Sequence, residues 1–210
     1  MKMLSLGLSI VFAVSSVFAQ GLVLKDKSVL ELNMGMWGGS RASSTIGING
    51  VDVSANTGSF AGNIVYAYGL REDVAVTLSA GLLTAGASSN FGTQGIDQRS
   101  SSIIPILIGI RYYVPSPEEG AKVRPFLSLG IGSFLGFEAG NTFGELMVQQ
   151  ARSENAFGGR LGAGIDFYLS NHFKLVANAG YNLMTDFSSS IAGRSNYNGG
   201  DFSIGAGFAF

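Results

Sequence analysis

Apolar and polar residues alternate along most of the chain. In the segment 29–37 the even positions carry the apolar residues Leu30, Leu32, Met34 and Met36. The odd positions of this segment include Glu31, Asn33 and Gly35. Successive side chains of a β-strand point to opposite faces, so the alternation predicts a strand with one apolar face and one polar or small face.

Seven further segments repeat this pattern. They are 63–69, 74–82, 104–112, 127–132, 160–169, 174–183 and 202–210. A helical reading competes only at 143–152, where the sequence is compatible with a short helix inside a loop. The chain is therefore predicted to be an all-β protein with eight strands.

Long and short connections alternate between these strands. The long ones, rich in Ser, Gly and Asn, are 39–58, 84–101, 138–156 and 185–200. The short ones are 71–73, 115–122 and 170–172. This order puts all four long loops at one end of a closed sheet, as in outer-membrane barrels with extracellular loops and periplasmic turns. We expect an eight-stranded antiparallel up-and-down transmembrane β-barrel in the cell outer membrane, with both termini in the periplasm.

Composition separates this fold from a secreted soluble sandwich or lipocalin-like barrel, which also has short strands and loops. Gly accounts for 31 of 210 residues and charged residues for only 13%. The polar strand faces are mostly Gly, Ser, Ala and Asn, which suit a narrow interior. The apolar faces are almost free of charge, as lipid requires, because Lys or Arg at the bilayer midplane costs about 2–4 kcal/mol.

The N-terminal segment has the features of a secretory signal peptide. A basic start at Lys2 precedes an apolar stretch over 4–14 and a small-x-small cleavage site that ends at Ala19. The alternative is a membrane anchor, but an uncharged run of about 16 residues is short for a span of roughly 20. We expect a signal peptide at 1–19 and the barrel at 20–210, with a short lead-in at 20–27.

Charge and composition exclude several kinds of site. A net charge of −1 gives no electrostatic basis for binding nucleic acid. The chain has no Cys and a single His, His172, so zinc sites and Cys/His catalysis are not expected. We predict no cofactor, no metal site and no catalytic residues.

The last strand carries a motif that resembles the recognition signal of Gram-negative outer-membrane barrels. The motif is Ser203-x-Gly205-x-x-Phe208-x-Phe210, and every position matches. The stretches IPILIGIRYYVP (104–115), RPFLSLGIG (124–132) and GAGIDFYLSNH (162–172) are also similar to the small eight-stranded barrels of the outer-membrane protein A, X and W kind. The resemblance implies that the barrel assembly machinery is a partner during biogenesis, with outer-membrane lipid and lipopolysaccharide around the folded barrel.

Six charged residues share the inward parity of their strands. Five fall near the periplasmic ends, Glu31, Arg111, Arg124, Asp166 and Lys174, and the sixth, Arg160, falls near the outer end of its strand. Charges in so narrow a lumen should pair, because a buried unpaired charge is costly. Equal depth on the fourth and sixth strands suggests Arg111 and Asp166 as partners. Two interpretations remain open: a structural plug of ion pairs, or a gate on a path for a small solute.

These observations predict a structural or surface-interaction role through the four long extracellular loops. The alternative is a narrow channel for small or hydrophobic solutes, since eight strands enclose just enough space for side chains or one small ligand. A third class is suggested by barrels of this size that modify lipid A with a His and a Ser near the outer leaflet. It fits poorly, because His172 falls in a predicted periplasmic turn, and we expect no enzyme. The sequence identifies no surface ligand.

Overall fold

The eight predicted strands are confirmed, and they form one closed antiparallel barrel in which every strand pairs with its neighbours in the chain. The computed structural model describes residues 24–48, 51–92, 95–115, 122–143 and 148–210; within 39–58, 86–99 and 140–151 it describes only the backbone. The first and last strands close the barrel through a ladder that runs from Val29–Ala209 to Trp37–Asp201. The expected signal peptide, 1–19, lies outside the described residues.

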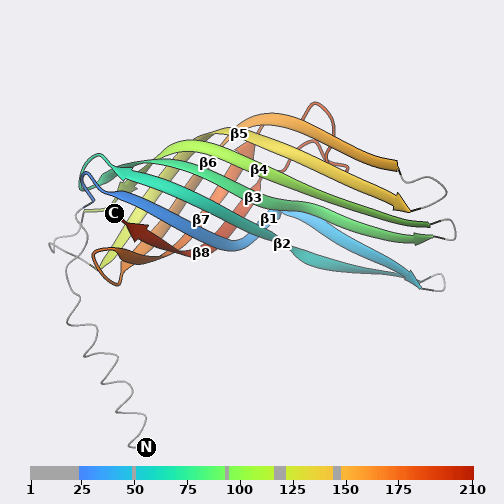
Figure 1. Cartoon of the computed structure of the whole chain (residues 1–210), viewed down its shortest axis with the longest axis horizontal. Coiled ribbons are helices and arrows are strands. Elements are labelled where there is room, and N and C mark those ends of the chain that lie inside the picture. Colours follow the sequence, from blue (N-terminus) through green and yellow to red (C-terminus); the bar gives the residue numbers. More distant parts are fainter. Residues whose placement is uncertain (1–23, 49–50, 93–94, 116–121, 144–147) are drawn as a thin grey trace, which may run out of the picture.

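The strands differ in length, so the two ends of the barrel look different (Figure 1). Their bounds are β1 Ser28–Ile48, β2 Val51–Gly69, β3 Val74–Gly92, β4 Gly95–Tyr113, β5 Val123–Phe143, β6 Val148–Tyr168, β7 Phe173–Met184 and β8 Gly199–Ala209. The C-terminus lies at the end with the short turns. At the opposite end the paired strands β1–β2, β3–β4 and β5–β6 extend well beyond β7 and β8.

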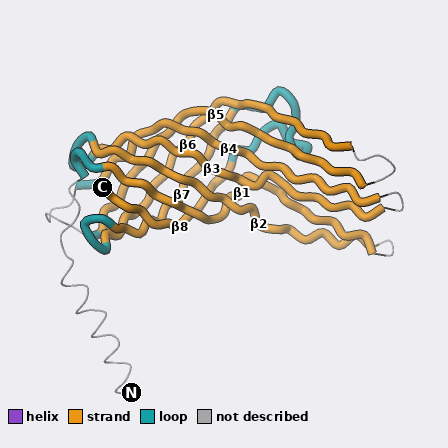
Figure 2. Tube along the Cα trace, in the orientation of Figure 1, coloured by secondary structure: helices purple, strands orange, loops and turns teal. Residues whose placement is uncertain are grey.

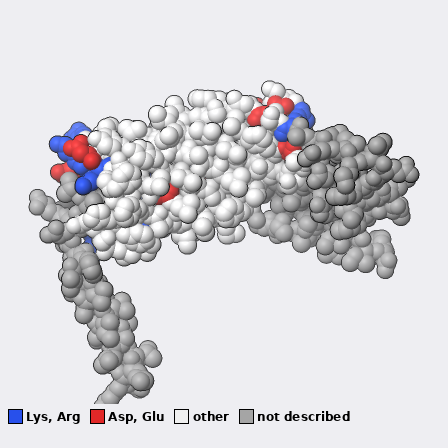
Figure 3. All heavy atoms as spheres, in the orientation of Figure 1, with Lys and Arg blue, Asp and Glu red and all other residues white. Residues whose placement is uncertain are grey.

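The predicted apolar and polar faces of the strands are also found in the structure. The even residues of β1 face outward, with Leu30, Leu32, Met34 and Met36 all exposed. Glu31 and Asn33, between them, are buried in the lumen. Figure 3 shows the consequence on the face in view: charged residues gather mainly at the two ends, and a broad, almost uncharged band separates them.

Three of the four predicted long loops are wrong. Most of 39–58, 84–101 and 138–156 is strand, and the barrel wall continues through these residues as hairpins (Figure 2). The reason is that polar Ser- and Asn-rich segments still satisfy their backbone groups by pairing with each other outside a membrane. The fourth, at 185–200, is largely a loop: 185–198 connects β7 to β8.

The short helix with which 143–152 is compatible is not found in the described part of this segment. Phe143 ends β5 and Val148–Arg152 belong to β6, while 144–147 lie outside the described residues. None of the described residues belongs to a helix with the length and apolar character needed to cross a membrane.

The extended hairpins are not all joined to one another. The β4–β5 ladder continues to Ile96–Phe143, whereas the β2–β3 ladder ends at Ala61–Leu83. Next to the last β2–β3 pair, the Thr84 side chain takes the place of a backbone pairing. Its hydroxyl accepts a hydrogen bond from the Phe60 amide at 2.8 Å and donates one to the Phe60 carbonyl at 3.2 Å. The described β2–β3 ladder does not continue beyond this point, although β1 also contacts β3.

Candidate functional site

Four charged side chains from four strands meet in the lumen. They are Glu31 on β1, Arg111 on β4, Asp166 on β6 and Lys174 on β7, called the charge quartet below. Arg111 donates to both carboxylate oxygens of Glu31, from Nη1 to Oε1 at 2.5 Å and from Nη2 to Oε2 at 2.9 Å. The Lys174 ammonium bridges the two acids, with Glu31 Oε1 at 2.6 Å and a hydrogen bond to Asp166 Oδ2.

The charge quartet is almost completely buried. Glu31 and Asp166 are 0% exposed, Lys174 is 2% exposed and Arg111 is 5% exposed. Two cations and two anions balance, and each charge has an opposite charge within 4 Å. Removing charges from water is strongly unfavourable unless they are paired with good geometry, so this arrangement is stable only as a complete set.

Aromatic residues support the quartet from the end of the barrel with the short turns. The Tyr113 hydroxyl donates to Asp166 Oδ2 at 2.9 Å and accepts from Arg111 Nη1 at 3.3 Å. The Phe126 ring lies 4.2 Å from the centre of the Arg111 guanidinium. Together they fix the direction of the arginine fork toward Glu31 and exclude water from one side of it.

A glycine makes room for two members of the quartet. Gly207 on β8 lies opposite Glu31 on one side and Lys174 on the other. A Cβ at this position would lie 2.9 Å from Lys174 Cε and 3.2 Å from Glu31 Cγ. The small inward residues of the strands thus provide the volume that the long charged side chains occupy.

Five charged residues are predicted near the periplasmic ends of their strands, and the structure brings four of them together. Arg124 lies apart from the quartet: it is half-buried at the rim, donates to the Glu72 carbonyl at 2.5 Å and stacks over Tyr113 at 4.7 Å. The hypothesised pair of Arg111 and Asp166 is the longest contact of the set, at 3.9 Å. The main partner of Arg111 is Glu31, because the tilted strands bring β1 and β4 face to face across the lumen.

Arg160, the sixth predicted residue, forms a second polar cluster closer to the hairpin end of the barrel. Its guanidinium binds Asp201 through two hydrogen bonds of 2.5 and 3.0 Å and donates to Asn178 Oδ1 at 2.8 Å. Asn182 donates to the same Asp201 carboxylate at 2.7 Å. Sequence reasoning missed Asp201, although extending the alternation of the last strand by one step places it on the inner face.

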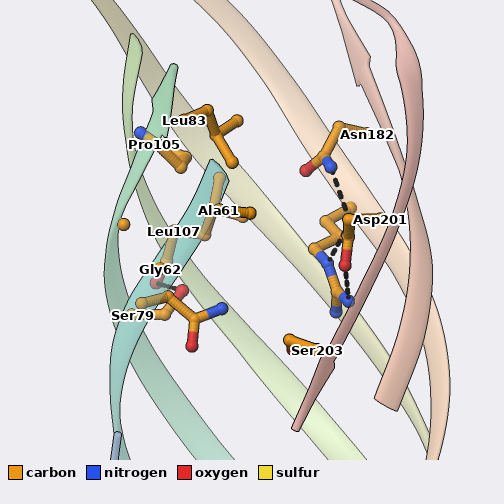
Figure 4. Close-up of a pocket in the computed structure, with 12 residues that line it drawn as sticks. Ala61, Gly62, Ser79, Leu83, Pro105, Leu107, Asn182, Asp201 and Ser203 are labelled. Atoms are coloured by element: carbon orange, nitrogen blue, oxygen red, sulfur yellow. Dashed lines mark hydrogen bonds and ion pairs between the residues drawn. The ribbon is translucent and has the colours of Figure 1, made fainter. Parts of the chain in front are cut away.

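Beside this cluster lies a cavity of about 40 Å³ (Figure 4). Arg160, Asn182, Asp201 and Ser203 form one wall. The opposite wall is mostly apolar or small and includes Ala61, Gly62, Ser79, Leu83, Pro105 and Leu107. A space of this size holds only a few water molecules or a very small solute.

An apolar layer closes the lumen at the hairpin end. The β7–β8 loop, 185–198, contributes Phe187, Ile191 and Tyr197, all almost fully buried. The Tyr197 ring lies 6.0 Å from Trp37 and 6.2 Å from Phe187, and its hydroxyl donates to the Ile191 carbonyl. We call this loop the cork.

The cork is tied to the barrel rim. The Ala192 amide donates to Glu138 Oε2 at 3.1 Å, and Arg152 donates to the Ser190 carbonyl at 3.4 Å. Burial raises the pKa of Tyr197 to about 12, so its hydroxyl remains a hydrogen-bond donor at any physiological pH. Nothing in the sequence pattern indicated that this loop would enter the lumen.

The residues of the C-terminal motif take different positions. Phe208 and Phe210 are exposed on the outer face, 54% and 62% respectively. Ser203 is buried and lines the cavity. Gly205 faces β1 so closely that a Cβ would overlap the Leu32 carbonyl.

His172 and the described acidic residues form no metal cluster. His172 is exposed in the β6–β7 turn, where its ring stacks on Phe208 with centroids 6.1 Å apart. Within the described part of the chain, no three His, Asp or Glu residues are arranged to hold a metal ion.

Comparison with known proteins agrees with this architecture. The family profile described as "Outer membrane protein beta-barrel domain" matches residues 28–210. No curated protein matches the chain in sequence.

Several solved structures share the fold. Neisserial surface protein A has a TM-score of 0.55 and 13% identity, covering 89% of this chain and 98% of its own. A major outer membrane protein from Thermus thermophilus has a TM-score of 0.53 and 18% identity, covering 88% and 99%. Ail, the attachment invasion locus protein of Yersinia pestis, has a TM-score of 0.52 and 17% identity, covering 89% and 99%. At these identities the likeness extends to the fold alone.

Proposed function

Because this chain belongs to the outer membrane protein β-barrel family, we propose that it is a closed, non-conducting barrel of the outer membrane that presents its three extended hairpins and the cork for structural or surface interactions. The family implies location in the outer membrane, so the uncharged band faces lipid. In the proposed orientation the short turns and both termini lie in the periplasm, and the hairpins project from the cell.

The observation that carries this proposal is the dry charge quartet. Its four members are at most 5% exposed and pair across the lumen from four different strands. A permeation path through this level would require all of these ion pairs to separate in a desolvated interior, which is strongly unfavourable. The cork adds a second closure at the other end.

The proposed role excludes enzymatic activity. The single histidine of the chain, His172, lies with Phe208 at the turn end of the barrel. In the proposed orientation this is the periplasmic end, away from the outer leaflet where a lipid-modifying site would act. Mass spectrometry of lipid A from cells with and without the protein tests this, with identical spectra expected.

The second candidate is the narrow channel, and the cavity beside Arg160 and Asp201 favours it. The cavity sits in mid-lumen and has a polar wall, so a solute that passed the quartet would find a binding surface there. Its volume limits such a solute to a few non-hydrogen atoms.

Recording in planar lipid bilayers distinguishes the two candidates. The purified, folded protein should give no steady conductance at physiological salt. As a matched pair, Arg111→Ala removes a cation of the quartet and Arg71→Ala removes an exposed cation whose partner Asp73 lies 3.6 Å away at the rim. A leak in Arg111→Ala alone is expected, whereas steady conductance of the wild-type protein would refute the closed barrel.

The surface role needs its own test. A variant in which residues 43–56 are replaced by an Asn-Gly turn shortens the β1–β2 hairpin and keeps Ala42 opposite Thr57. We expect the same amount of folded barrel, the same absence of conductance, and reduced adhesion of expressing cells to immobilised glycans and matrix proteins. If every hairpin can be shortened in turn without any change in adhesion, the surface role is wrong.

A further inference from the structure

The segment before the first strand enters the barrel. Leu24 is 2% exposed although it precedes β1 by four positions. It packs into an apolar cluster at the end with the short turns, whose other members are Val29, Ala67, Ala75, Tyr113, Phe126, Tyr168, Val176 and Ala209. These eight residues come one from each of the eight strands, so Leu24 occupies the mouth of the lumen and not its wall.

Backbone hydrogen bonds hold this segment in place. The Asp26 amide donates to the Gly69 carbonyl, and the Gly69 amide donates to the Lys27 carbonyl, both at 2.9 Å. The Lys27 amide donates to the Leu24 carbonyl at 3.0 Å and closes a turn, in which Asp26 has a left-handed φ of 59°. We call residues 24–27 the latch.

The end of β2 is adapted to the latch. Gly69 has no positive φ, so its backbone does not require glycine. A Cβ at Gly69, however, would overlap the Leu24 carbonyl. Any other residue at this position would push the latch out of the mouth.

The latch lies next to the aromatic residues that cover the charge quartet. Leu24 shares its cluster with Tyr113, whose hydroxyl contacts both Asp166 and Arg111. It also shares the cluster with Tyr168, whose ring lies 5.9 Å from the Lys174 ammonium. Leu24 therefore excludes water from the mouth next to the paired charges.

We propose that the latch is a lid of the periplasmic mouth, which docks through Leu24 and Gly69 and opens without unfolding the barrel. The barrel ladder begins only at Ser28, so every hydrogen bond described for the latch can break while the β1–β2 and β1–β8 ladders remain intact. The latch is held by one buried side chain and by three hydrogen bonds to β2, the third from the Tyr68 hydroxyl to Asp26 Oδ1 at 3.4 Å. A segment with so few contacts is expected to open more often than the ladder beside it.

Accessibility of a single cysteine tests the lid. The chain has no native cysteine, and Val29→Cys places a thiol of similar size beneath Leu24, where the native side chain is 1% exposed. In the folded protein this thiol should react slowly with a maleimide. Adding Gly69→Ala or Leu24→Ser should raise the rate by about tenfold or more, since labelling of a buried site follows the population of the open state.

Gly200→Ala is the matched control. A Cβ at Gly200 has its nearest heavy atom at 3.7 Å, which is ordinary contact, so this variant should leave the labelling rate unchanged. Only the heat-modifiable, folded band is scored. An unchanged rate in both latch variants would overturn the lid. Failure of both variants to fold would also overturn it, because Leu24 would then belong to the folding core. Neither outcome bears on conductance, so this test is independent of the proposed function.

Discussion

The pairing of Arg111 with Glu31 is the most specific interaction in the charge quartet. A guanidinium presents parallel N–H groups that match a carboxylate, and both are used here. Lys174 contributes a point charge that satisfies two acids at once. The quartet is therefore asymmetric: the arginine defines the geometry, and the lysine balances the remaining charge.

Substitutions in the quartet should reveal this asymmetry. Arg111→Ala leaves two acids with one cation, and loss of one partner of a buried pair typically costs about 3–5 kcal/mol. The double variant Arg111→Ala/Glu31→Ala should recover part of this loss. The coupling free energy from a double-mutant cycle should be larger for Arg111 with Glu31 than for Arg111 with Asp166, at 3.9 Å.

Reversible unfolding of the barrel in lipid vesicles gives these free energies. Arg71→Ala is the control, because the exposed pair of Arg71 and Asp73 should contribute only about 0–1 kcal/mol. Strict additivity of the Arg111 and Glu31 losses would mean that the two groups are not coupled, and the plug would then be better described as a solvated channel.

Among the elements, the cork and the hairpins are stabilised in different ways. The hairpins satisfy their backbone groups by pairing beyond the barrel, whereas the cork turns back and buries apolar side chains. Its tip is a tight turn from Ile191 to Arg194, where the two residues bond each other's backbones and Ala192 and Gly193 have φ of 48° and 74°. Such a turn reverses the chain within two residues and directs Ile191 into the lumen.

Removing a ring from the cork should expose the only tryptophan of the chain, Trp37. Tyr197→Ala deletes the ring 6.0 Å from Trp37 and the hydrogen bond to Ile191. We expect stronger acrylamide quenching, red-shifted emission and a stability loss of more than about 1 kcal/mol, as for other buried aromatic truncations. The matched control is Tyr181→Ala on the lipid face, 49% exposed. Equal quenching in the two variants would mean that the cork does not cover Trp37.

At the scale of the whole molecule, the asymmetry of the two ends suggests an orientation. The described connections at the end where β8 finishes, β2–β3 and β6–β7, are short turns, while three hairpins extend from the other end. Outer-membrane barrels place long segments outside and short turns in the periplasm.

Cysteine labelling of intact cells tests the orientation. Single cysteines at Ser43, Ser89, Asn141 or Ser195 should react with a membrane-impermeant thiol reagent, because these positions lie on the hairpins or the cork. A cysteine at Asn171, in the β6–β7 turn, should not react until the cells are broken. The reverse labelling pattern would mean that the barrel has the opposite orientation in the membrane.

The outward aromatic residues at the end of β8 should matter for assembly. Phe208 and Phe210 face lipid next to the seam, where Ser28 and Phe210 exchange two backbone hydrogen bonds. Phe208→Ser with Phe210→Ser should lower the amount of heat-modifiable barrel in the outer-membrane fraction. The lipid-facing Phe202→Ser, further along β8, should have a smaller effect. Equal amounts in the wild type and the double variant would count against a role in assembly.

The alternation of residues predicted the eight strands, their inward and outward faces and the lumen position of the charged residues. This information is local, because the side-chain period of two holds in any strand irrespective of its partners. Composition alone predicts loops at the hairpins, whereas the turn signals in the same segments predict paired strands. Asn49-Gly50, between Ile48 and Val51, is a strong sequence signal for a two-residue hairpin turn.

Which charges pair was decided only by the tertiary structure. Arg111 and Glu31 are 80 positions apart, and their contact depends on how far the strands tilt when the sheet closes. The sequence by itself determined that both side chains point inward, but parity carries no information about partners across a barrel. The entry of Leu24 and Tyr197 into opposite ends of the lumen is equally non-local. Both residues lie outside the alternating segments, and the mouths that receive them exist only after the barrel has closed.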